Sequence, residues 1–133
     1  MIRTILAALC LFTAGTQAGA AQSLAQDPTV RQGFYAIGLA DEIRKNCPAI
    51  SPRLVRAYTF LKSLESYALE SGYSQDDIED LKDDDAARSE LEAQIEADLR
   101  SRGATPGNTA GYCQVGREEM ARGTSAGRLL RGN

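Results

Sequence analysis

Apolar residues along this chain recur at intervals of three and four positions, which is the spacing of one face of an α-helix. Alternating runs of β-branched residues, which are typical of strands, are nearly absent. The pattern therefore predicts an all-α protein. Five helices are expected: from Asp27-Pro28 to Cys47, from Ser51-Pro52 to Ser71, from Ser74 through Leu81, from Asp85 to Arg102, and from about Thr109 to Arg122.

Each expected helix begins or ends at residues suited to that position. Asp27 and Ser51 each precede a proline, which combines an N-cap residue with the residue favoured at the first helical position. Ser74, followed three residues later by Asp77, resembles a capping box. The second helix has the widest expected apolar face, formed by Leu54, Tyr58, Leu61, Leu64 and Ala68 and widened by Val55 and Leu69.

The expected architecture is a small orthogonal bundle of four to five short helices. We predict a signal peptide over residues 1–20, a disordered N-terminal segment over 21–26, a helical domain over 27–123 and a C-terminal tail over 124–133. The tail is expected to form a short helix or to fray. A bundle of this size buries little apolar surface and benefits from a covalent crosslink.

The first residues have the three parts of a secretory signal peptide. Arg3 supplies the positive charge, residues 4–14 form an apolar stretch too short to span a bilayer, and Ala18-Gly19-Ala20 is a small-residue cleavage site. Cleavage after Ala20 or Ala21 is expected, and an uncleaved anchor is the alternative. Loss of Arg3 would change the formal net charge from −3 to −4. The predicted location is the periplasm.

Three cysteines occur in the sequence, and signal-peptide cleavage would remove Cys10. Cys47 and Cys113 then remain, and an even number of cysteines in an oxidising compartment predicts one structural disulfide between them. A catalytic Cys–His pair is impossible because the chain contains no histidine. There is no C-x-x-C motif either.

No motif in the sequence indicates catalysis, a cofactor or a metal. The acidic run QDDIEDLKDDD offers oxygen ligands of the kind that calcium prefers, but it lacks the glycine and the distal glutamate of a calcium-binding loop. A solvated acidic helix face is the favoured interpretation. We expect no catalytic residue, no cofactor and no metal, and therefore a protein that is not an enzyme.

Charge is distributed unevenly along the chain. Eleven acidic residues lie between Asp76 and Asp98, whereas six arginines and only two acidic residues follow Leu99. The favoured interpretation is attraction between these two regions within the molecule, together with the preference of helix ends for particular charges. The alternative is a bipolar surface that docks on a partner or, at most peripherally, on an anionic membrane. The predicted contact residues of that surface are Arg122, Arg128, Leu129, Leu130 and Arg131.

Three segments resemble a family of small exported proteins from alphaproteobacteria, a domain of unknown function. They are AIGLADEIRKNCPAISPRLVRA (36–57), LESYALESGYSQDDIED (64–80) and YCQVGREEMARGTSAGRLLR (112–131). The resemblance covers most of the chain after residue 20 and implies no known activity. It also implies genes near those of the respiratory NADH:quinone oxidoreductase.

Two functions agree with these observations. The first is a non-enzymatic periplasmic interaction protein, an accessory module of an envelope or respiratory assembly with a protein partner. The second is an acid-stress holdase, because protonation of the acidic run would leave the arginines unopposed and loosen the domain. Nucleic acid is not an expected partner, because the exported chain is acidic overall.

Overall fold

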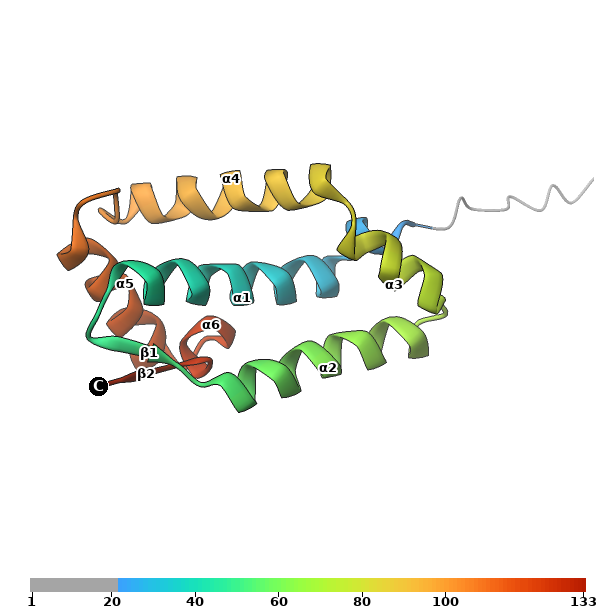
Figure 1. Ribbon diagram of the computed structural model, residues 1–133, viewed down its shortest axis with the longest axis horizontal. Coiled ribbons are helices and arrows are strands. Elements are labelled where there is room, and N and C mark those ends of the chain that lie inside the picture. Colours follow the sequence, from blue (N-terminus) through green and yellow to red (C-terminus); the bar gives the residue numbers. More distant parts are fainter. Residues whose placement is uncertain (1–21) are drawn as a thin grey trace, which may run out of the picture.

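The computed structural model describes residues 22–133 (Figure 1). The predicted signal peptide and its cleavage site lie outside these residues. The predicted all-α class is confirmed. The elements are a 3₁₀-helix (Leu24–Gln26), α1 (Pro28–Asn46), β1 (Ile50–Pro52), α2 (Leu54–Glu70), α3 (Gln75–Lys82), α4 (Asp85–Ser101), α5 (Thr109–Arg122), α6 (Ser125–Arg128) and β2 (Leu130–Gly132).

The start of α1 is fixed by the buried carboxylate of Asp27. One of its oxygens accepts hydrogen bonds from the backbone N–H groups of Thr29 and Val30, at 2.9 and 3.1 Å. The other accepts hydrogen bonds from the hydroxyls of Tyr67 and Tyr73, at 3.2 and 3.5 Å. The predicted N-cap is therefore confirmed, and it also ties the first turn of α1 to the end of α2 and the loop that follows.

Helix α1 lies in the middle of the molecule and packs against α2, α4, α5 and α6. Figure 1 shows α4 on one side of α1 and α2 on the other, with α3 near the N-terminal end of α1 and α5 and α6 near its C-terminal end. Helices α2 and α4 therefore lie on opposite sides of α1, and α1 separates them.

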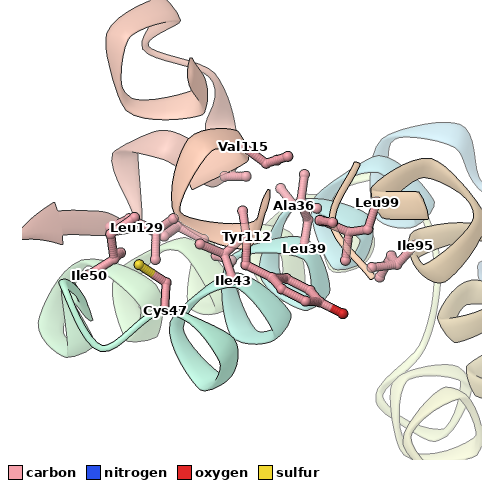
Figure 2. Close-up of a cluster of buried hydrophobic side chains, with 14 residues drawn as sticks. Ala36, Leu39, Ile43, Cys47, Ile50, Ile95, Leu99, Tyr112, Val115 and Leu129 are labelled. Carbon is pink, nitrogen blue, oxygen red and sulfur yellow. The ribbon is translucent and has the colours of Figure 1, made fainter. Parts of the chain in front are cut away.

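The main core surrounds the C-terminal half of α1 (Figure 2). Ile43 of α1, Cys47 directly after it and Val115 of α5 are fully buried there. Gly116 lets the two helices approach, since a Cβ at this position would lie 2.7 Å from Cγ2 of Ile43. Cys47 and Cys113 form a disulfide across the same contact, as predicted, with Cα atoms 5.1 Å apart.

The structure contradicts the expectation for the N-terminal segment and selects the short-helix alternative for the C-terminal tail. In the segment expected to be disordered, Leu24–Gln26 form the 3₁₀-helix, and Leu24 is buried in a second, smaller apolar cluster with Val30, Ala68 and Ile78. The C-terminal tail is not a frayed end either. It forms α6, as its helical signals indicated, and then β2, which pairs antiparallel with β1 and places Pro52 opposite Leu130.

The tail folds because its apolar residues complete the main core. Leu129 and Leu130 are only 3% and 2% exposed and pack with Ile43, Cys47 and Ile50. Gly127 is required at the turn into this packing, because a Cβ there would collide with the main-chain carbonyl of Glu119. Residues 124–133 therefore belong to the helical domain and not to a separate tail.

Loss of the disulfide is expected to destabilise the fold strongly. The bond closes a loop with a sequence separation of 66, and chain entropy alone gives about 4 kcal/mol for a loop of this length. The double variant Cys47→Ala/Cys113→Ala should lose a comparable free energy of unfolding in urea titrations. The oxidised wild type should take up no label when alkylated without reduction. Uptake of two labels, or equal stability of variant and wild type, would contradict the structural role of the bond.

Candidate docking surface

The outward side of α2 carries an apolar strip that no other described element covers. We call it the α2 outer face; its members are Leu54, Val55, Tyr58, Leu61 and Leu69. Leu54, Val55 and Tyr58 are 73%, 82% and 64% exposed. Single exposed apolar residues are ordinary, but a contiguous group on one helix commonly marks an interaction site.

The apolar face predicted for this helix exists, but most of it is not covered by the rest of the fold. Only Leu64 and Ala68 of the expected apolar face are buried. Leu64 packs closely against Gly33 of α1, where a Cβ would lie within 3.0 Å of Cγ of Leu64. Because α4 lies on the far side of α1, nothing packs against the opposite side of α2 (Figure 1).

Four arginines gather where α2 begins and the chain ends. We call them the arginine cluster; they are Arg53, Arg56, Arg128 and Arg131, and they line a hollow of about 220 Å³ together with Met120 and Leu130. The Nε of Arg53 donates to the main-chain oxygen of Leu130 at 2.9 Å, and Arg56 donates to the main-chain oxygen of Arg128 at 3.5 Å. Pairing of β1 with β2 thus brings residues of α2 and of the C-terminus together.

None of the four arginines forms an ion pair with any residue of 22–133. The four positive charges repel one another, and the helix dipole adds to this repulsion. Helix N-termini favour anions, whereas Arg53 is the N-cap residue of α2. The first turn of α2 contains no acidic residue and Arg53 makes no side-chain cap. The local charge therefore lacks compensation within the described part of the chain.

The predicted contact residues are only partly brought together. Arg128 and Arg131 belong to the arginine cluster, whereas Arg122 pairs with Glu119 at 2.7 Å. The expectation that Leu129 and Leu130 are exposed is wrong, because both complete the core. Sequence reasoning missed Arg53 and Arg56, although two arginines in the first turn of a helix were a detectable departure from the usual charge preference.

The favoured interpretation of the charge pattern is confirmed for the helix ends but not for attraction between the two regions. Acidic residues lie in the first turns of α3 and α4, and arginines lie in the last turns of α4, α5 and α6. Arg100, which pairs with Glu96 at 2.5 Å, is the one C-terminal arginine that forms an ion pair with the acidic stretch 76–98 within residues 22–133. Figure 1 shows α3 and the start of α4 at one end of the molecule and α6 and β2 at the other. The acidic residues of α3 and of the start of α4 are therefore separated in space from Arg128 and Arg131.

A buried carboxylate holds α5, α6 and the loop after α4 together. Glu119 is only 4% exposed and accepts bonds from Arg102 at 2.8 Å, from Arg122 at 2.7 Å and from the hydroxyl of Thr124. Burial raises the pKa of Glu119, but the bond from Thr124 and the guanidinium of Arg102 outweigh it and hold the pKa below the ordinary 4.5. Thr124 also caps α6, so this network fixes the position of Arg128.

A larger hollow of about 310 Å³ lies at the other end of the molecule. Its apolar lining includes Val30, Phe34 and Leu91. Arg31 and Glu90 also line it and pair with each other at 3.1 Å across α1 and α4. Within residues 22–133 there is no cluster of three or more histidine, cysteine or acidic side chains arranged to hold a metal. None of the described helices is long and apolar enough to cross a bilayer.

This chain belongs to the family of unknown function DUF5333, whose model matches residues 22–131. The family of unknown function that the sequence resemblance indicated is thus confirmed at that level, while its taxonomic range and its export stay predictions. No curated protein and no solved structure matches the chain significantly.

Replacement of Glu119 by glutamine should destabilise the protein at neutral pH and much less in acid. The substitution keeps the shape but removes the charge that Arg102 and Arg122 neutralise, which is expected to cost about 2 kcal/mol. Because the folded-state pKa is lowered, the carboxylate stabilises the fold above pH 4.5 and that contribution is lost as the pH falls through the lowered value.

Urea unfolding of wild type and Glu119→Gln at neutral and acidic pH measures this difference. Glu118, which is exposed and also pairs with Arg102, provides the matched control Glu118→Gln. A free-energy difference for Glu119→Gln that stays constant with pH would show that its charge is not what stabilises the network.

Proposed function

We propose that this protein is a non-enzymatic interaction protein of the periplasm, an accessory module that attaches to an envelope or respiratory assembly. The observation that carries the proposal is that the exposed Leu54, Val55 and Tyr58 and the arginine cluster, which needs an anionic counterpart, both lie at the N-terminal end of α2. Tyrosine and arginine are enriched in the central parts of protein interfaces, where they contribute much of the binding energy.

The disulfide supports the proposed location. Structural disulfides persist in oxidising compartments and are rare in the cytosol. The predicted signal peptide supports export as well. A rigid, crosslinked helical domain also suits an accessory module, because a preformed surface loses little conformational entropy when it binds.

Site-specific photo-crosslinking in native cells tests the proposal. A benzoylphenylalanine at position 58 replaces a 64% exposed tyrosine on the α2 outer face, and the same residue at position 92 places the probe on the exposed surface of α4. We expect one discrete adduct from position 58 and none from position 92. Equal adducts from both positions, or none from either, would count against a docking role of this surface.

The holdase is a second candidate, and the buried Glu119 network is the observation that favours it. Acid would remove the charge that holds Arg102 and Arg122, and α6 would loosen together with the buried Leu129 and Leu130 that follow it. The protein should then suppress aggregation of an unfolded client at about pH 3 and not at about pH 7. The Glu119→Gln variant should be active at a higher pH than wild type. Suppression that does not depend on pH would remove this candidate.

A further inference from the structure

We propose that the arginine cluster, with Leu54, Val55 and Tyr58 of the α2 outer face, binds the headgroup layer of an anionic phospholipid bilayer. The inference rests on the proposed function, since it names what covers the same surface. The protein would lie peripherally on the membrane, with the first half of α2 in the interface.

The charges of the surface fit this occupant. Arg53, Arg56, Arg128 and Arg131 are exposed, lie around one hollow and have no ion-pair partner among the described residues. A guanidinium binds phosphate oxygens in a bidentate manner and carries less tightly held water than an ammonium group. Four of them together require several anions at close spacing, which a layer of phosphate headgroups provides.

The apolar residues lie where such a contact needs them. Leu54, Val55 and Tyr58 occupy the first turns of α2, at the same end of the helix as Arg53 and Arg56 but directed to a different side of it. An interfacial helix buries short apolar side chains at the boundary between headgroups and acyl chains while its cations remain at the phosphates. Tyrosine is typical of that boundary, because its ring is apolar and its hydroxyl stays hydrated.

The shape and the remaining charge favour a lipid surface over an acidic protein segment. The apolar residues stand on the outer side of a single helix, more than half exposed, and none of them lines a hollow. A bilayer accepts such a protruding helix without a complementary groove. The acidic residues of α3 and of the start of α4 lie at the other end of the molecule (Figure 1), which orients the basic end toward an anionic surface.

Overall charge does not supply this attraction. The chain has a formal net charge of −3, so an anionic vesicle repels it on average. Binding must therefore come from the local cluster, and removal of two of its arginines must matter more than removal of two arginines elsewhere. This difference separates specific docking from general electrostatics.

A single tryptophan provides the readout, since the chain contains none. We would titrate the oxidised Tyr58→Trp protein with vesicles of phosphatidylcholine alone and of phosphatidylcholine mixed with phosphatidylglycerol. We expect a blue-shifted emission with the mixed vesicles only, weakened by added salt. A tryptophan at position 92 of α4 should show no shift.

Two charge-matched variants in the Tyr58→Trp background complete the test. Arg128→Gln/Arg131→Gln should bind the mixed vesicles about 30-fold more weakly, from the usual contribution of each basic residue near an anionic surface. Arg88→Gln/Arg100→Gln changes the net charge equally on exposed positions of α4 and should bind like the parent. Val55→Ser should weaken binding without changing its salt dependence.

The outcomes are distinct from those of the crosslinking experiment. No shift with the mixed vesicles, or equal weakening by both charge variants, would overturn the lipid inference. If position 58 nevertheless gives a discrete protein adduct in cells, the proposed function stands and the surface belongs to a protein partner. Vesicle binding that requires Arg128 and Arg131 supports the inference whether or not an adduct forms.

Discussion

The contact between the C-terminal half of α1 and α5 is the interaction on which the rest of this structure depends. Ile43, Cys47 and Val115 are fully buried in it, Gly116 permits the close approach, and the disulfide crosslinks it. Beyond this contact α1 touches each neighbouring helix separately, and α2 and α4 do not support each other. The crosslink therefore acts where a small bundle has its most concentrated apolar packing, and it restricts the unfolded chain over half of its length.

The same contact sets the path of the C-terminal residues. Once α5 is fixed against α1, the buried Glu119 orients Arg102, Arg122 and Thr124, and Thr124 caps α6. Leu129 and Leu130 then enter the core, and β2 pairs with β1. This pairing brings Arg131 next to the start of α2. The arginine cluster is therefore a product of tertiary structure, assembled from residues about seventy positions apart, and its geometry depends on a carboxylate that itself forms no part of it.

Local signals in the sequence predicted the elements well, and they predicted the surface poorly. The cap at Asp27 and the capping box at Ser74 could be predicted because each involves residues that are close together in the sequence. The disulfide could be predicted because only two cysteines remain after the predicted signal peptide. Periodicity located the apolar residues of α2 but gave no information on which neighbouring element covers them, so it did not show that Leu54 and Tyr58 are exposed. Three-residue strands have no pattern of their own, and nothing local distinguishes the buried Glu119 from the exposed Glu118. Arginines at a helix N-terminus depart from the usual preference for acidic residues there, and this departure, which the sequence does show, marks the candidate site.

The arginine cluster and the α2 outer face both raise the free energy of the unbound protein, for different physical reasons. Uncompensated guanidinium groups repel one another, and exposed leucine, valine and tyrosine side chains order water. Each feature alone is tolerable on a small domain. Their adjacency at one end of the molecule means that one anionic, partly apolar partner relieves both at the same time. The acidic residues of α3 lie at the other end of the molecule (Figure 1), and salt weakens the interaction between such separated charges. The basic end thus acts as an independent surface on a protein whose overall charge has the opposite sign.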